Sequence, residues 1–175
     1  MNNLSFHITD IMTNSIRAKA SEIGLFIEER DLRITIRIAD NGLGMDAGTI
    51  ARVTNPFYTT RTTRKVGLGI PFLIQNAEQT GGAVSITSQP GKGTVVTASF
   101  CSNHIDCPPW GDLPGTVAML ITGNPDINIC FEYQAVKTVF SISTSEIKEI
   151  LDGIPLSYPK VMLLVKEIIK ENIRP

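Results

Sequence analysis

Apolar residues near the amino terminus recur with the spacing of a helix. Along residues 4–20 they fall near the 3.6-residue period, and no Gly or Pro interrupts the segment. These apolar residues are Phe6, Ile8, Ile11, Met12 and Ile16. We therefore predict an amphipathic helix over residues 4–20, with one face packed against the rest of the protein.

The next two segments have the pattern of strands. Residues 23–28 and 32–39 are rich in apolar residues, and in the second segment Ile34, Ile36 and Ile38 alternate with polar side chains. An alternation of period two turns one face of a strand toward the core and the other toward solvent. Both segments are therefore predicted to be strands.

A second helix and a pair of strands follow. Residues 70–80 are apolar with helical spacing and end at Gly81-Gly82, and residues 83–88 and 94–100 flank the turn sequence QPGKG. The order helix, strand, strand, loops, helix, strand, strand predicts an α/β two-layer sandwich over residues 1–100. In such a fold a mixed sheet carries its helices on one face.

The chain changes character after residue 100. Residues 101–115 contain three Pro and two Gly and are predicted to be a linker. Residues 116–175 are expected to form a small α+β subdomain, either with a core of its own or as a platform for a partner or substrate. Its predicted elements are strands at 116–122, 127–133 and 137–142, followed by two helices.

Composition and charge narrow the class of protein. With 175 residues, 42% of them hydrophobic, and a net charge of −1, the chain has no overall attraction to nucleic acid or to a membrane surface. No apolar run approaches the roughly 18 residues of a membrane span. Three cysteines without a secretory leader predict a cytoplasmic protein.

Three polar residues share one side of the first predicted helix. His7, Asp10 and Asn14 lie at positions i, i+3 and i+7, so their side chains project in similar directions. A carboxylate and a carboxamide four residues apart can bind one Mg²⁺ together with phosphate oxygens, because Mg²⁺ takes oxygen ligands. The alternative is an ordinary solvated helix face.

A carboxylate also follows the strand at residues 32–39. The sequence DNGLGMD begins at Asp40, where a fixed carboxylate beside apolar residues can accept a hydrogen bond from an exocyclic amine. Gly42 and Gly44 would leave room for a flat ring against the backbone. This segment is therefore a candidate site for a nucleotide base.

The segment NPFYTTRTTRKVGLGIP, residues 55–71, is rich in Thr and in basic side chains, which favours a surface loop. Gly67 and Gly69 precede the apolar helix, where backbone N–H groups and the helix dipole attract an anion. We predict that this loop closes over phosphate groups. An ordinary tight turn is the alternative.

A metal site is a weaker hypothesis for the linker. Cys101, His104 and Cys107 are spaced three residues apart and are residue types that bind soft metals. The fourth ligand of a structural zinc site is missing nearby, and the spacing matches no common zinc finger. The alternative is that these residues bind no metal.

Taken together, these segments resemble the GHKL ATPase superfamily, which includes gyrase, Hsp90, histidine kinases and MutL. In the family's order, the similar segments are DIMTNSIRAKA (asparagine box), DNGLGMD (first glycine box), NPFYTT (phenylalanine box), KVGLGIP (second glycine box) and GGAVSITSQPGKGTVVTASF (closing hairpin). The resemblance covers residues 10–100 and implies the ATP-binding (Bergerat) fold of this superfamily.

The resemblance implies ATP and Mg²⁺ as cofactors. Asp10 and Asn14 would hold Mg²⁺ and take part in catalysis, and Asp40 would bind the adenine amino group. The nucleotide-binding residues implied in this way are Asn14, Ala18, Asp40, Gly42, Gly44, Met45, Phe57, Thr59, Thr60, Arg61, Arg64, Lys65, Val66, Gly67, Leu68, Gly69 and Thr94.

Within the superfamily, the phrase NPFYTTR before a short segment ending in GLG is most similar to histidine-kinase ATP-binding domains. In the gyrase and MutL branches a Glu four residues before the Asn activates water, and Asp10 takes that place here. Phosphoryl transfer depends mainly on positioning and charge neutralisation. The difference therefore counts more against a hydrolase than against a kinase.

Because the first predicted helix begins at residue 4, we expect no phosphoacceptor domain ahead of it. His7 lies on that helix, where a positioning or phosphate-contacting role is favoured over phosphate acceptance. We therefore expect a separate protein as acceptor or regulatory partner in signal transduction. The alternatives are an anti-sigma-type, nucleotide-switched binding protein or serine kinase, and a slow ATP hydrolase that acts as a clamp and forms a homodimer.

Overall fold

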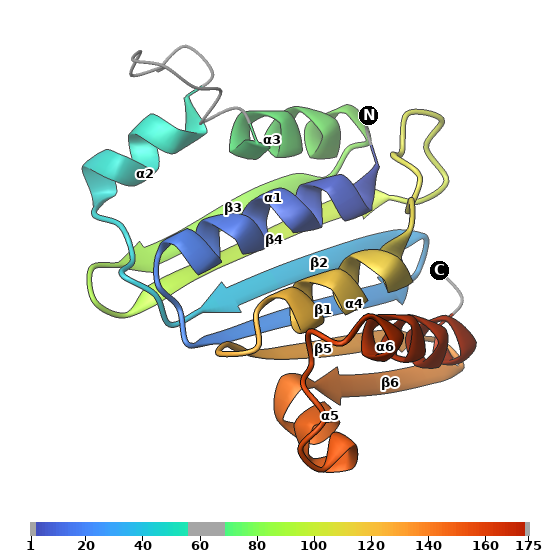
Figure 1. Cartoon of the computed structure of the whole chain (residues 1–175). Coiled ribbons are helices and arrows are strands. Elements are labelled where there is room, and N and C mark those ends of the chain that lie inside the picture. The colour runs from blue at the N-terminus through green and yellow to red at the C-terminus, as the bar shows by residue number, and fades with distance from the viewer. Residues whose placement is uncertain (1–2, 56–68, 174–175) are drawn as a thin grey trace.

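The computed structural model describes residues 3–55 and 69–173. Figure 1 shows the elements in chain order along the colour ramp. They are α1 (Leu4–Arg17), β1 (Glu22–Arg30), β2 (Arg33–Asp40), α2 (Ala47–Thr54), α3 (Gly69–Gln79), β3 (Ala83–Gln89), β4 (Gly93–Cys101), α4 (Leu113–Gly123), β5 (Asn128–Ala135), β6 (Thr138–Ser143), α5 (Thr144–Leu151) and α6 (Pro159–Asn172).

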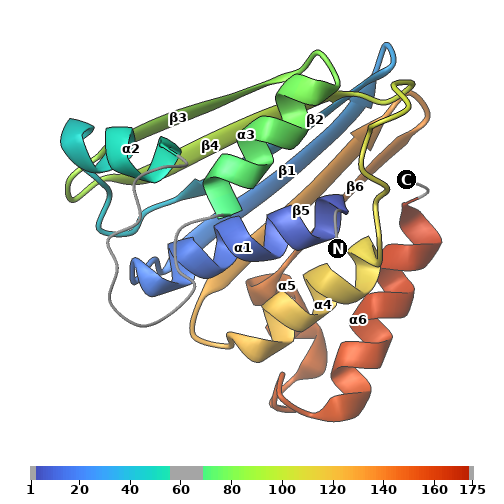
Figure 2. The same cartoon turned by 90° about the horizontal axis from the view of Figure 1, so that it is seen from above.

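Six strands form one mixed sheet in the order β3-β4-β2-β1-β5-β6. Neighbouring strands run antiparallel except β1 and β5, which are parallel. Helices α1, α3, α4 and α6 lie on one face of the sheet (Figure 2). The predicted α/β two-layer fold, a mixed sheet with helices on one face, is confirmed.

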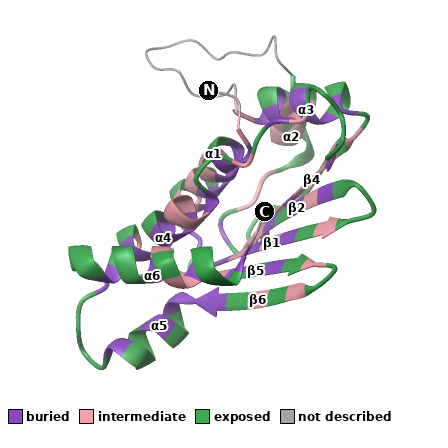
Figure 3. Ribbon diagram, turned by 90° about the vertical axis from the view of Figure 1, so that its right-hand side faces the viewer, coloured by how far each residue is buried: buried purple, intermediate pink, exposed green. Residues whose placement is uncertain are grey.

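The hydrophobic pattern of β2 matches its two environments. Ile34, Ile36 and Ile38 are buried beneath the helices, whereas Arg33 and Arg37 are exposed on the other face. Figure 3 shows buried and exposed residues following one another along the strands. The alternation read from the sequence therefore identifies which face of the sheet forms the core.

One prediction in the carboxyl-terminal part is wrong. Residues 116–122, expected to be a strand, lie in helix α4. The helix begins after Asp112, whose Oδ1 accepts a hydrogen bond from the backbone N–H of Gly115 at 3.0 Å. Nearly every side of this helix is buried, so its continuous apolar run has no polar face to reveal a helical period.

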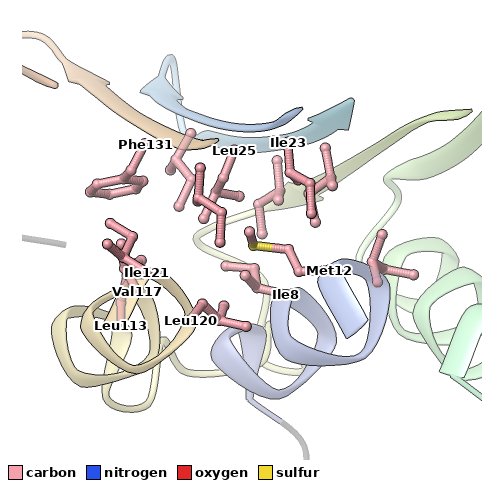
Figure 4. Packing of buried hydrophobic residues seen from close by; sticks show 14 of the residues in the cluster. Ile8, Met12, Ile23, Leu25, Leu113, Val117, Leu120, Ile121 and Phe131 are labelled. Atoms are coloured by element: carbon pink, nitrogen blue, oxygen red, sulfur yellow. The ribbon is translucent and has the colours of Figure 1, made fainter. Parts of the chain in front are cut away.

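Residues 116–175 do not build a separate core. Strand β5 pairs with β1, extending the sheet formed by the first half of the chain. Leu113, Val117 and Ile121 of α4 pack together with Leu25 of β1 and Phe131 of β5 (Figure 4). The buried apolar residues of both halves form one hydrophobic cluster.

The segment predicted as a linker is bound to the start of α1. The backbone N–H groups of Leu4 and Ser5 donate to the carbonyl oxygens of Pro109 and Trp110 at 2.9 and 3.0 Å. The first N–H groups of a helix have no partner within the helix, so these carbonyls complete the hydrogen bonding of α1.

No helix in the described part of the chain is long and apolar enough to span a membrane.

Candidate functional site

Asp40, at the end of β2, is fixed by donors from three segments. Its Oδ2 accepts from the Ser15 hydroxyl at 2.6 Å, and its Oδ1 accepts from the N–H groups of Gly42 at 2.9 Å and Thr94 at 3.2 Å. A carboxylate has about four acceptor positions, so one remains for a further donor. Asp40 is half-buried and held in place, which suits the recognition of an amine.

Gly42 is required where the loop after β2 meets α1. A Cβ at this position would lie 2.7 Å from the carbonyl oxygen of Ala18 and 2.9 Å from its Cβ. The next residue, Leu43, donates its N–H to the same carbonyl at 2.8 Å. Packing against Ala18 therefore accounts for the glycine at position 42. Contact with the nucleotide stays a prediction for Gly42 and for Ala18.

Gly44 and Gly93 allow two backbone segments to meet. Gly44 has φ +67°, and a side chain there would overlap the carbonyl oxygen of Gln89. Gly93 has φ +98°, and its side chain would overlap the carbonyl oxygen of Asp40. Only glycine fits both the conformation and the space. These contacts hold the β3–β4 turn against the loop that begins with Asp40.

Ser88 joins Met45 to Thr94. Its Oγ accepts from the Met45 N–H at 2.7 Å, donates to the Gly93 carbonyl at 2.9 Å, and lies 2.9 Å from the Thr94 hydroxyl. Ser88 and Ser15 are positioning residues that the sequence analysis missed. A hydroxyl within a regular strand or helix gives no signal of a distant partner in a single sequence.

Asp10 lies against the beginning of α3. A Cβ added to Gly69, the first residue of that helix, would lie 2.8 Å from Asp10 Oδ2. Burial raises the pKa of the Asp10 carboxyl above its ordinary value, and the charge of Arg17 offsets part of that rise. Asn14, one turn further along α1, is exposed. A carboxylate whose charge is partly uncompensated, beside an accessible amide oxygen, fits a bound cation.

These contacts gather the described candidate residues at one end of the sheet. Ser15 follows Asn14 in α1 and binds Asp40, which pairs in register with Thr94 of β4. Nine further candidates lie outside the described residues, and their roles stay predictions. They are Phe57, Thr59, Thr60, Arg61, Arg64, Lys65, Val66, Gly67 and Leu68.

His7 does not share the accessible surface of Asn14. Its side chain is 2% exposed, and its Nε2 lies 2.8 Å from Nδ2 of Asn76 in α3. Its Nδ1 is buried without a hydrogen-bond partner. The three polar residues therefore do not share one accessible face, because His7 is buried and Asn14 is exposed.

The proposed metal ligands in the linker do not form a metal site. The segment makes two consecutive turns, with the His104 N–H donating to Cys101 and the Cys107 N–H donating to His104 at 3.2 and 3.0 Å. Burial raises the pKa of the Cys107 thiol, which disfavours the thiolate that a metal requires. Among residues 3–55 and 69–173, no group of three or more His, Cys, Asp or Glu residues could hold a metal ion.

Comparison with known proteins finds matches to the first part of the chain. Residues 3–103 match the family model described as histidine kinase-, DNA gyrase B-, and HSP90-like ATPase. The chain is 30% identical over 106 residues to the sensor histidine kinase YxdK of Bacillus subtilis (strain 168), covering 55% of this chain and 32% of that protein. It is 35% identical over 93 residues to the sensor protein kinase FleS of Pseudomonas aeruginosa, covering 51% and 23%.

The chain spans about a third or less of the length of these curated relatives. Among solved structures, the N-terminal domain of a DNA repair protein has a TM-score of 0.58 at 18% identity, covering 81% of this chain and 51% of that one. At this identity the likeness concerns the fold alone. The coverage exceeds residues 3–103, so the likeness includes part of the carboxyl-terminal half. The match of residues 3–103 to the family model confirms the resemblance seen in the sequence motifs.

Proposed function

Because the chain belongs to the family of histidine kinase-, DNA gyrase B-, and HSP90-like ATPases, we propose that it binds Mg²⁺-ATP and phosphorylates or regulates a separate protein. The observation that carries the proposal is the Asp40 carboxylate, which accepts three hydrogen bonds and keeps one acceptor position. A donor in that position would be bound by a carboxylate whose orientation is already fixed. The adenine amino group is such a donor.

The phosphate end of the proposed site would be formed by α1 and α3. Asp10 and Asn14 would hold Mg²⁺, which when bound neutralises part of the triphosphate charge. Gly69 would place the amino terminus of α3 close to the phosphates, because a residue without Cβ lets the backbone approach. Arg61, Arg64 and Lys65 would add positive charge, as their residue types suggest.

Protein phosphorylation is the favoured use of the bound ATP. The relatives with matching sequence are sensor kinases, and phosphoryl transfer needs mainly positioning and charge neutralisation, for which this set of residues is suited. The phosphate acceptor in this proposal is a separate protein, which places the chain in signal transduction.

Slow ATP hydrolysis is the second candidate, and the state of Asp10 favours it. Burial raises the pKa of this carboxyl, and a carboxylate with a raised pKa is a better general base near neutral pH. Hydrolysis predicts phosphate release that falls in Asp10→Asn while binding of an ATP analogue persists. Kinase activity predicts labelled protein instead.

Thermal unfolding with and without Mg²⁺ and a non-hydrolysable ATP analogue tests the nucleotide site. Ligand at about a hundred times its Kd should stabilise wild type by ~2.7 kcal/mol. Asp40→Asn should lose most of this shift. Asp106→Asn is the matched control, because this exposed carboxylate lies near the opposite end of β4. No shift in wild type would contradict the proposal.

Transfer of phosphate is tested with ATP labelled at the γ-phosphate. The protein is incubated with an extract of the native cells, and labelled proteins are separated from labelled inorganic phosphate. Wild type should label a protein that Asn14→Ala does not label. If wild type and Asn14→Ala give the same pattern, the kinase proposal fails and measured phosphate release decides the second candidate.

A further inference from the structure

A buried polar pair joins the two helices that form the phosphate end of the proposed site. His7 of α1 is 2% exposed and Asn76 of α3 is 7% exposed, and the Asn76 amide nitrogen lies 2.8 Å from His7 Nε2. An amide nitrogen donates, so Nε2 accepts and the neutral imidazole carries its proton on Nδ1. In the described part of the chain, this is the only side-chain hydrogen bond between α1 and α3.

The pair is not explained by stability alone. Nδ1 of His7 is buried without a partner, and burial of an unpaired polar atom costs free energy. Two apolar side chains of similar size would avoid this cost, since replacing both partners of a buried hydrogen bond is often neutral or stabilising. The feature that apolar side chains would not reproduce is direction, because a hydrogen bond fixes how two helices are aligned along their axes.

The apolar packing beside His7 does not by itself fix that alignment. His7, Ile11 and Leu73 border a small void of about 10 Å³ whose other lining residues are apolar. Apolar contacts have no preferred direction, and a void permits small displacements. The hydrogen bond is therefore the contact that can specify the position of α3 along α1.

The same faces of the two helices carry the phosphate end of the site. Asp10 lies three residues after His7, and Gly69 lies seven residues before Asn76, so each pair shares one side of its helix. Gly69 packs against the Asp10 carboxylate. Figures 1 and 2 show α1 and α3 side by side, with the amino terminus of α3 toward the carboxyl half of α1. A shift of α3 would thus move its first turn relative to Asp10.

We propose that the His7–Asn76 pair is a positioning element that aligns the amino terminus of α3 with Asp10 and so sets the affinity of the site for the triphosphate. This inference rests on the proposed function. The pair should not affect adenine binding, because Asp40 is held by Ser15, Gly42 and Thr94, none of which lies in α3. Recognition of the base and recognition of the phosphates are therefore separable by mutation.

The experiment compares three proteins: wild type, the double variant His7→Leu/Asn76→Leu, and His7→Gln, in which the Gln oxygen can still accept from Asn76. Calorimetry gives the Kd of adenosine and of a non-hydrolysable ATP analogue with Mg²⁺, and thermal unfolding gives the midpoint. The Leu pair should unfold at or above the wild-type midpoint and bind adenosine as wild type does. Its affinity for the ATP analogue should fall by about tenfold to a hundredfold, the range expected when one hydrogen bond to a charged group is lost. His7→Gln should retain most of the wild-type affinity.

Several outcomes would overturn the inference. A folded Leu pair with unchanged affinity for the ATP analogue excludes a positioning role, and an equal loss for adenosine and the ATP analogue indicates a general structural effect instead. If the Leu pair does not fold, Asn76→Ala supplies the same comparison of the two ligands. Wild type that binds neither ligand would overturn the proposed function itself, and the inference with it.

Discussion

The two ends of the candidate site are held in different ways. Asp40 accepts three hydrogen bonds, from α1, from the loop after β2 and from β4. The Asp10 carboxylate receives no hydrogen bond from any residue between 3 and 55 or between 69 and 173, and burial raises its pKa. One carboxylate is therefore fixed before any ligand arrives, and the charge of the other is balanced only in part by the described residues around it.

This difference has opposite consequences for stability. Removing a contact at the Asp40 end should destabilise the fold, because the hydrogen bonds from Ser15 and Thr94 join segments that are distant in sequence. Removing the charge at the Asp10 end should stabilise the ligand-free fold, because a site kept ready for a cation carries uncompensated charge. Substitutions at the two ends should thus change stability in opposite directions.

The largest expected effect is at Gly93, behind Asp40. Gly93→Ala would place a Cβ onto the carbonyl oxygen of Asp40 at φ +98°, and we expect a loss of more than about 3 kcal/mol in the free energy of unfolding. Gly91→Ala is the matched control, since Gly91 also has positive φ (+75°) but no atom near its added Cβ. It should cost about 1–2 kcal/mol from backbone strain alone. Urea unfolding measures both, and equal losses would contradict the overlap.

A smaller loss is expected when one donor to Asp40 is removed. Ser15→Ala deletes the hydroxyl that lies 2.6 Å from Asp40 Oδ2 and should cost about 1.5–3 kcal/mol, as for a hydrogen bond to a charged group. It should also weaken adenosine binding. Thr9→Ala in the same helix removes a hydroxyl that donates to the Ser5 carbonyl, and should change neither property appreciably. Unchanged adenosine affinity in Ser15→Ala would show that Asp40 does not depend on this donor.

Part of the fixed end of the site was visible in the sequence. Asp40 could be predicted because a carboxylate directly after an alternating strand has a defined place at the end of that strand. The glycines at 42 and 44 could be found by residue type, but the contacts that require them involve Ala18 and Gln89. Such contacts depend on pairing between distant segments, which a single sequence does not show.

The missed parts share a physical reason. Helix α4 and a buried strand have the same continuous apolar pattern, so residues 116–122 were assigned wrongly. The parallel pairing of β1 with β5 crosses about a hundred residues of chain and leaves no local signal, so a core of its own was one of the two expectations for residues 116–175. The contact of His7 with Asn76 joins two helices far apart in sequence, and neither residue type predicts the other.

The pH dependence of stability separates the buried histidine from the exposed one. Burial lowers the pKa of His7. In the unfolded chain this imidazole takes up a proton near the ordinary His pKa of about 6.5, whereas in the folded protein it takes up the proton only at lower pH. Wild type should therefore lose stability as pH falls from about 7 to 5, because the unfolded state binds more protons there. His7→Gln should remove much of this slope, and His104→Gln, at the other histidine, should keep it. Melting temperatures across this range give the comparison.

The smallest effect is expected at Asp10, and its sign is the sharpest test of the comparison. The raised pKa means that the folded protein disfavours the charged carboxylate, so the stability associated with the protonated form is lost as pH rises through the folded pKa. Asp10→Asn should therefore raise the melting temperature of the ligand-free protein at pH 7, by less than Ser15→Ala lowers it. The gain should vanish near pH 3, where Asp10 is protonated in both the folded and the unfolded protein. The control is Glu171→Gln, at an exposed carboxylate of α6, which should change the melting temperature little at either pH. If Asp10→Asn instead destabilises the protein at pH 7, Asp10 has favourable charge interactions in the fold, and the phosphate end of the site is as well balanced as the end built around Asp40.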